Sequence, residues 1–183
     1  MLFCISDILL KLKKGILVYP CYAGSMFCCL PQGRAKVGVP QESYLCSLDF
    51  FDEKNLPQET YDLIIGNPPW VSRKKTATAT ATRWCKTRSL PMPANELAWA
   101  FVWRALELVK KPQGLTAFLL PAMGMLLNLE DGPIAARKIW LARVRLHRVV
   151  NLADTSFLLF EGAKRPTVLC LYTPASGNAQ NYT

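Results

Sequence analysis

The sequence predicts an α/β protein, with a mostly parallel sheet that is partial at its N-terminal side and ends in an antiparallel pair of strands. Three observations lead to this fold class. Aliphatic runs without alternation, such as "YDLIIGN" (61–67), are typical of strands buried in a parallel sheet. A clear helical pattern separates that run from "LTAFLLP" (115–121), as in a βαβ unit. Two further apolar runs, at 148–153 and 166–172, are close enough in sequence to pair antiparallel.

The composition is that of a folded, basic protein. A chain of 183 residues can bury one substantial core, and a hydrophobic content of 51% excludes a disordered chain. Lysine and arginine number 22 against 13 acidic residues, which gives a net charge of +9. This charge suits a polyanion such as nucleic acid or an anionic membrane surface, but it selects neither, because many soluble proteins are basic.

The cysteines and the single histidine narrow the chemistry. The sequence has no C-x-x-C pair, and His147 is the only histidine, so no zinc ligand set is present and we expect no metal. The lone histidine also argues against a Ser-His or Cys-His nucleophile. We expect buried or free thiols in a reducing cytoplasm. The seven cysteines are Cys4, Cys21, Cys28, Cys29, Cys46, Cys85 and Cys170.

The N-terminal region has some features of a signal peptide. Three lysines precede the apolar run "GILVYPCYAGSMFCCL" (15–30), as in the basic and apolar parts of such peptides. The run has 16 residues and is interrupted by Pro20. A membrane span needs about 20 mostly apolar residues. We therefore expect a core segment, in which "GILVY" could form a strand, and no membrane association; a membrane anchor is the minor alternative.

The next elements lead to a long connection. "YLCSLDFF" (44–51) predicts a short strand that runs into an acidic turn, and 61–67 is the second strand. Residues 68–93 then form a long loop with four prolines and the run "TATATAT", whose composition favours flexibility. A loop of this length is usually functional or disordered. It has no acidic residue, and its basic residues are Arg73, Lys74, Lys75, Arg83, Lys86 and Arg88.

"NELAWAFVWRALELVKK" (95–111) is the clearest helix. Leu97, Phe101 and Leu108 fall on one face at helical spacing. Asn95 is the expected N-cap, and the closing lysines suit the negative end of the helix dipole.

After the strand at 115–121, "PIAARKIWLARVRLH" (133–147) predicts a second helix that begins with a proline. Its apolar stripe includes Trp140 and Val144. The two closing strands follow, and the chain ends in a polar tail.

The stretch "DLIIGNPPW" (62–70) ends a predicted strand in hydrogen-bond acceptors and a flat ring. In open α/β sheets, ligands bind beyond the carboxyl ends of the strands, where Asn67 falls. Pro68 and Pro69 restrict the backbone and lack amide donors, which leaves their carbonyls as acceptors. Asn67 adds a side-chain carbonyl, and Trp70 adds an apolar ring face. Together these groups fit a planar ring that carries an NH2 group.

Such a site would solve a problem in adenine chemistry. The exocyclic amine of adenine is a poor nucleophile, because its lone pair is delocalised into the ring. Two acceptors on its hydrogens would localise that pair without any titrating side chain, so the rate would come from positioning and preorganised dipoles. A base from a duplex must first be flipped out, and Trp70 could stack on it. The plain alternative is a proline-terminated strand with a packed tryptophan; the basic loop and βαβ unit that follow favour the functional interpretation.

At this point the sequence resembles the N6-adenine DNA methyltransferases that use S-adenosylmethionine, including the large enzymes of restriction–modification and phage-defence systems. "DLIIGNPPW" is similar to their catalytic motif, in which Asp, Asn or Ser precedes two prolines and an aromatic residue. "ELAWAFVWRALELVKKPQGLTAFLLP" resembles the helix and strand that follow, and "VVNLADTSFLLFEGAKRPTVLCLY" resembles the closing antiparallel pair. The resemblance covers residues 30–174, and N-P-P-W is its specific part.

The resemblance implies a Rossmann-like S-adenosylmethionine methyltransferase sheet and a role for each motif residue. Asn67 and the Pro68 carbonyl would accept hydrogen bonds from the target amine, and Trp70 would stack on the base. Asp49, with Phe50 beside it, would border the adenine of the cofactor; a strand-end turn is an equally good interpretation of Asp49. The six basic loop residues would contact phosphates, or would form a solvated loop.

The sequence departs from the family on the side of the methyl donor. It has no G-x-G turn, and "VYPCYAGS" (18–25) is a weak echo of one, so the S-adenosylmethionine site is incomplete. The family's sheet also places two strands between those that end at Asp49 and Asn67, and these have no counterpart here. We expect three parts: an unassigned segment at 1–40, a partial catalytic core at 41–174 and a polar tail at 175–183. Target recognition would come from a separate domain or subunit.

Three functions remain open. The first is methylation of adenine N6 in DNA, which Trp70, the basic loop and the downstream resemblance favour. The second is methylation of another amine, either glutamine in release factors or guanine in ribosomal RNA, because those families share the N-P-P motif. The third is an inactive nucleic-acid-binding remnant, which the missing glycine turn favours.

Overall fold

The computed structural model describes residues 16–19, 27–29, 45–47, 50–51, 53–54, 60–70, 79–155 and 165–176. A five-stranded sheet with the order β1-β4-β5-β7-β6 organises them. Strands β1, β4 and β5 are parallel, and β7 runs antiparallel to both β5 and β6. The predicted α/β fold with a closing antiparallel pair is therefore confirmed. The strands of this sheet are β1 (Ile16–Tyr19), β4 (Leu63–Gly66), β5 (Leu115–Pro121), β6 (Val144–Asn151) and β7 (Thr167–Pro174).

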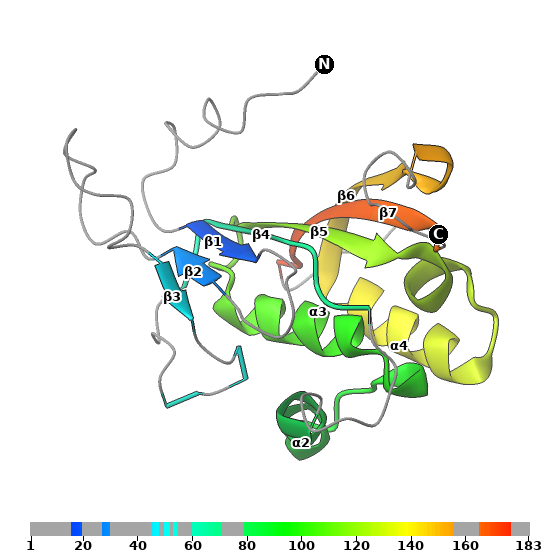
Figure 1. Cartoon of the computed structure of the whole chain (residues 1–183), viewed down its shortest axis with the longest axis horizontal. Helices are drawn as coiled ribbons and strands as arrows, with labels where there is room; N and C mark the ends of the chain where they lie inside the picture. Colours follow the sequence, from blue (N-terminus) through cyan, green and yellow to red (C-terminus); the bar gives the residue numbers. More distant parts are fainter. Residues whose placement is uncertain are drawn as a thin grey trace.

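The predicted βαβ unit is formed by β4, α3 (Leu97–Leu108) and β5. Figure 1 shows α3 and α4 (Asp131–Leu141) along one face of the sheet, with α2 (Ala79–Thr87) across α3 from the sheet. Every residue of α3 except Glu107 is buried, because neighbours cover this helix on both sides.

Aromatic rings join this helical layer to the sheet. The Trp99 and Trp103 rings of α3 stack with their centroids 5.5 Å apart. The Trp140 ring of α4 lies perpendicular to Trp99 at 6.4 Å and perpendicular to Tyr172 of β7 at 5.3 Å. Offset-stacked and perpendicular arrangements are the favourable ones for aromatic pairs, so these rings tie both helices to β7.

Burial alternates along β5. Thr116, Phe118 and Leu120 are fully buried, whereas Leu115, Ala117 and Leu119 are half-buried. The strand is thus fully covered on the face that carries α3 and less covered on the other, although its mostly apolar sequence is typical of a strand covered on both faces.

Three sequence predictions about helices are corrected. The helix predicted at 133–147 ends at Leu141, and β6 begins at Val144. Val144 is buried as expected, but it lies in a strand that pairs with β7. Its helical spacing from Trp140 also fits a helix, and the hydrogen bonds and packing of the strand decide between the two structures. Asn95 is not an N-cap: it lies in the turn η3 (Pro93–Asn95) at φ 53°, and Glu96 precedes the first residue of α3.

The long connection is also more ordered than predicted, because α2 includes part of its threonine–alanine run. Ala81, Trp84 and Cys85 are buried, and the Trp84 ring lies 5.6 Å from that of Phe51. Tertiary packing of these residues stabilises a helix that intrinsic propensity alone does not predict. The rest of the run, before Ala79, lies outside the described residues.

The strand predicted at 44–51 is shorter than expected and lies elsewhere. The strand β3 (Leu45–Ser47) pairs antiparallel with β2 (Phe27–Cys29) in a separate two-stranded sheet. The resemblance placed it in the parallel sheet, and that placement is wrong. The "GILVY" strand, in contrast, is confirmed as β1.

A buried arginine connects the turn at residues 50–54 to α3. Arg104 is 5% exposed and donates hydrogen bonds to the Phe50 carbonyl at 3.3 Å and to Glu107 at 2.6 Å. Arg88 also pairs with Glu107, at 2.9 Å, and with Glu53, but it lies nearer the surface. The two arginines therefore share acidic partners and differ in burial.

Replacing these two arginines should have unequal effects on stability. Arg104→Met removes a buried hydrogen bond to the Phe50 carbonyl and the pairing with Glu107, so we expect a loss of about 1–3 kcal/mol in the free energy of unfolding. Arg88→Met should cost less than about 1 kcal/mol, because exposed ion pairs contribute little. Urea unfolding of both variants tests this order, and equal losses would contradict it.

Two cysteines lie in the described core as free thiols, Cys85 and Cys170. Burial raises the pKa of each thiol to about 12. The expectation of buried free thiols is confirmed for these two.

At about pH 8, neither thiol should react with iodoacetamide in the folded protein, because the thiolate is the reactive form. Both should react once urea unfolds the chain. Peptide mass spectrometry measures this, and fast modification of either cysteine in the native state would contradict its placement.

None of the helices in the described part of the chain has both the length and the apolar character of a membrane span. The same residues contain no group of three or more side chains arranged to bind a metal ion.

Candidate active site

The carboxyl ends of β1, β4 and β5 meet at one edge of the sheet. Tyr19 of β1 is in register with Gly66 of β4, and Gly66 is in register with Phe118 of β5. Residues 67–70 continue from β4 at this edge. The turn η4 (Met123–Leu127) follows β5 there, and β7 begins beside Pro121. This edge is where ligands bind in open α/β sheets.

Asn67 places an unused acceptor at this edge. Its side-chain oxygen Oδ1 is buried, and within the described structure it has no hydrogen-bond partner. Leaving a buried acceptor unpaired costs about 1–3 kcal/mol, so such groups are rare. Several other buried polar atoms of the described residues also lack a partner, including the indole nitrogens of Trp84, Trp99 and Trp140 in the apolar core. Asn67 differs from these in its position at the carboxyl end of a strand. A ligand that donates an N–H would satisfy Asn67.

The other three motif residues lie beside it. Pro68 is buried, and Pro69 and Trp70 are half-buried. The four consecutive residues of the N-P-P-W motif therefore follow the carboxyl end of β4, and their role at a site stays a prediction.

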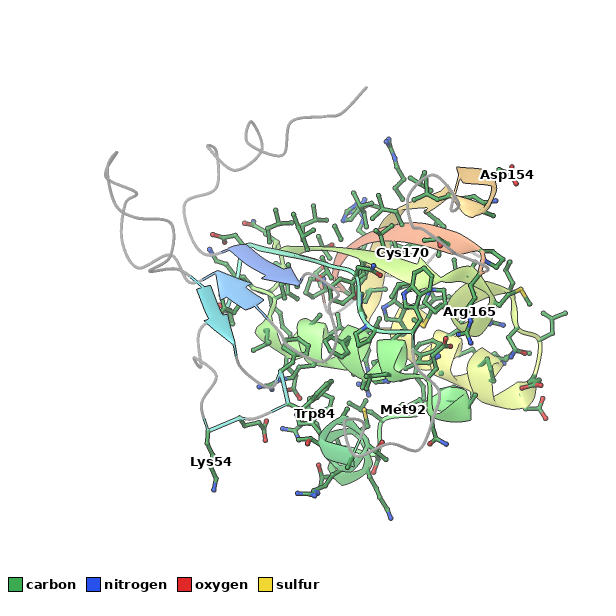
Figure 2. All side chains as sticks on the ribbon, in the orientation of Figure 1. Lys54, Trp84, Met92, Asp154, Arg165 and Cys170 are labelled. Carbon is green, nitrogen blue, oxygen red and sulfur yellow. The ribbon has the colours of Figure 1, made fainter. Side chains whose placement is uncertain are left out.

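Two residues that the sequence did not single out for this site contact its end. Nη1 of Arg165 lies 3.5 Å from the Trp70 carbonyl oxygen and 3.9 Å from Oε1 of Glu96. Figure 2 labels Arg165 at the end of the sheet near η4. The sequence predicted no role at this site for Glu96, and nothing near Arg165 in the sequence indicates its partners, because β7 brings it there.

Glu96 is an acid in an unusual place. It is 7% exposed, and burial raises the pKa of its carboxyl group, while the nearby Arg165 guanidinium lowers it. Its carboxylate occupies the position that a Cβ atom on Gly124 would take. The carboxylate of Glu96 can therefore take this position only because residue 124 is a glycine.

The donor side of the site is described only in part. Because β1 lies parallel beside β4, the segment after Tyr19 starts at the same edge as Asn67. That segment and Asp49 lie outside the described residues. Phe50 is 1% exposed and stacks on Phe101 at 4.9 Å, so its described contacts are those of a core residue, and its place beside a cofactor stays a prediction.

The predicted nucleic-acid residues fall into three groups. Arg83 and Lys86 are exposed on α2. Arg88 is held by two carboxylates and lies over the Trp84 ring at 4.5 Å, so it is engaged within the fold. Arg73, Lys74 and Lys75 lie outside the described residues.

Comparisons with known proteins agree on one family and one fold. A model of the family described as Eco57I restriction-modification methylase matches residues 39–157, more than half of the chain. The methyltransferase subunit of a type I restriction-modification system from Streptococcus thermophilus is similar in structure, with a TM-score of 0.51 and 22% identity, over 77% of this chain and 30% of that one. The M protein of the type I restriction enzyme EcoKI has a TM-score of 0.50 and 18% identity, over 69% of this chain and 23% of that one.

At these identities the structural likeness concerns the fold. This chain covers less than a third of the length of either structure. No curated protein sequence matches it.

Glu96→Gln should stabilise the protein increasingly as the pH rises. A carboxyl group whose pKa is raised on folding stabilises the folded state below its ordinary pKa of about 4.3, and this contribution is lost as the pH rises through the folded value. The amide does not ionise, so the advantage of the variant should be larger at about pH 7 than at about pH 4. Urea unfolding across this range measures the gap, and a gap that does not change with pH would contradict the burial of Glu96.

Proposed function

This chain belongs to the Eco57I restriction-modification methylase family, and we propose that it transfers a methyl group from S-adenosylmethionine to the N6 amine of adenine in DNA. The observation that carries the proposal is the buried, unpaired Oδ1 of Asn67 at the carboxyl end of β4, followed directly by Pro68, Pro69 and Trp70. An acceptor that is costly to bury and that has no partner among the described residues supports a ligand with a hydrogen-bond donor.

The motif residues would act on the amine without titrating. Asn67 Oδ1 and the Pro68 carbonyl would accept one hydrogen bond each from the N6 amine. This pairing draws the nitrogen toward tetrahedral geometry, so its lone pair is localised and can attack. Since both acceptors are fixed before the substrate arrives, they lower the barrier through positioning and preorganised dipoles.

Trp70 would hold the base. An adenine in duplex DNA is inaccessible until it leaves the stack, and an aromatic face compensates for part of the lost stacking. The half-buried Trp70 keeps a large ring near the strand end for this purpose.

S-adenosylmethionine supplies the methyl group when it is bound. The parallel pairing of β1 with β4 supports this role, because "VYPCYAGS" (18–25) begins within β1, whose last residue, Tyr19, is in register with Gly66 next to Asn67. We assign the methionine part of the donor to that segment and its adenine to Asp49.

DNA is the proposed partner because the chain carries a net charge of +9 and two exposed cations on α2, Arg83 and Lys86. Sequence specificity would come from a separate target-recognition domain or subunit. The similar structures are much longer proteins, and one is described as a methyltransferase subunit, which supports this division.

Calorimetry and methylation assays on the 183-residue chain test the proposal. We expect S-adenosylmethionine to bind and adenine in DNA to be methylated. Asn67→Ala should lower kcat by about 100-fold or more, since it removes an acceptor used in the transition state. Asn67→Asp keeps an acceptor oxygen and should retain more activity than Asn67→Ala.

Two results would reject the proposal. No cofactor binding would exclude methyl transfer by this chain, and equal activity in Asn67→Ala and the unaltered protein would remove Asn67 from the site. Methylation of a release-factor peptide or of ribosomal RNA in place of DNA would reassign the substrate and keep the chemistry.

A further inference from the structure

A chain of contacts links the N-P-P-W motif to a buried acid. One guanidinium nitrogen, Nη1 of Arg165, is 3.5 Å from the Trp70 carbonyl oxygen and 3.9 Å from Oε1 of Glu96. These residues come from the end of the motif, the residue before α3 and the residue two before β7. The fold therefore brings three segments that are distant in sequence to one guanidinium.

The acidic end of this chain is enclosed by the fold. Glu96 directly precedes α3, whose positive end favours a carboxylate. Its side chain is buried and fills the space that the missing side chain of Gly124 leaves open. Because Glu96 is packed between α3 and η4, its carboxylate offers the guanidinium of Arg165 a partner in a defined position. The side chain of Arg165 is 55% exposed.

We propose that Arg165, held by Glu96, is a positioning residue that fixes the Trp70 carbonyl and so keeps the acceptors of the N-P-P-W motif facing the target amine. This inference rests on the proposed function, and it adds a residue outside the motif. The two prolines already restrict φ at positions 68 and 69, so the remaining freedom of the segment lies in its ψ angles and in the Trp70 peptide. A donor on the Trp70 carbonyl restricts that last peptide plane.

The contact between Arg165 and the Trp70 carbonyl should affect the orientation of the motif more than the stability of the fold. An ion pair with one partner half-exposed adds little to the free energy of unfolding. Displacement of a reacting group by about 1 Å, in contrast, can lower a rate by about 100-fold. The contact should therefore be visible in kcat and in the surroundings of Trp70, with little change in stability.

A different role for Arg165 makes the opposite prediction. If its exposed guanidinium bound a DNA phosphate, its loss would raise KM for DNA and reduce the salt dependence of binding, while kcat stayed the same. The kinetic constants thus separate the two roles.

The test compares Arg165→Met, which keeps an unbranched apolar side chain and removes the guanidinium donors, with Arg145→Met, which removes an exposed arginine from β6. The five tryptophans give separate indole N–H signals in a ¹H–¹⁵N spectrum, and Trp70→Phe identifies that of Trp70. We expect Arg165→Met to shift or broaden the Trp70 signal and to lower kcat between about 10- and 100-fold, with KM for DNA changed less than about threefold. Arg165→Lys should recover part of kcat, and Arg145→Met should change neither quantity.

Glu96→Gln provides a second variant that keeps the shape of the acid. It should move the Trp70 signal in the same direction as Arg165→Met and by less. An unchanged Trp70 signal in Arg165→Met, or an unchanged kcat with a raised KM, would overturn the inference. If the unaltered chain does not methylate DNA, the proposed function fails, while the Trp70 signal still decides whether Arg165 positions the motif.

Discussion

The burial of α3 is the constraint on which the rest of the described structure depends. Its C-terminal end is tied to the start of β4, because the Tyr61 amide donates to the Leu108 carbonyl at 2.8 Å and the Lys110 amide donates to the Tyr61 carbonyl at 2.9 Å. Its Trp99 contacts Trp140, which in turn contacts Tyr172 of β7. The position of the helix therefore determines where Glu96 lies relative to the strand ends. It also determines the position of β7 and of Arg165, which precedes β7. A change in the packing of α3 would reach the site through both of these residues.

The candidate site combines two groups whose burial is unfavourable. Asn67 Oδ1 has no donor in the described fold, and the Glu96 carboxyl is buried with only a half-exposed arginine near it. A well-packed core stabilises the fold sufficiently to tolerate such groups, and in natural proteins they gather at functional sites. Their position at one sheet edge, beside two prolines, makes the functional interpretation stronger than either group alone would.

The features that could be predicted from the sequence are those set by nearby residues. The runs at β4 and β5 and the pattern of α3 are local, and so is the N-P-P-W motif, which is why they were found with nearly correct bounds. The predicted helix extended too far because Val144 fits both the apolar stripe of a helix and a buried position in a strand. The helix α2 was missed because Trp84 stabilises it through Phe51, which is distant in sequence. Arg165 and Glu96 were missed for the same reason. Their contact depends on where β7 lies in the fold, and no local sequence pattern predicts it.

The register of β1 changes how the missing glycine turn should be understood. Tyr19 pairs beside Gly66, so the segment after β1 begins at the edge where the acceptor residues lie, although residues 16–19 fall outside the region that matches the family. The backbone pairing of β1 with β4, which depends little on side chains, therefore brings the end of β1 to the edge where Asn67 lies. In a glycine-rich turn, glycines allow a tight bend and a close approach of the backbone to a ligand. The absence of G-x-G from the sequence therefore bears on how closely a ligand could approach the backbone, whereas the end of β1 reaches this edge without any glycine.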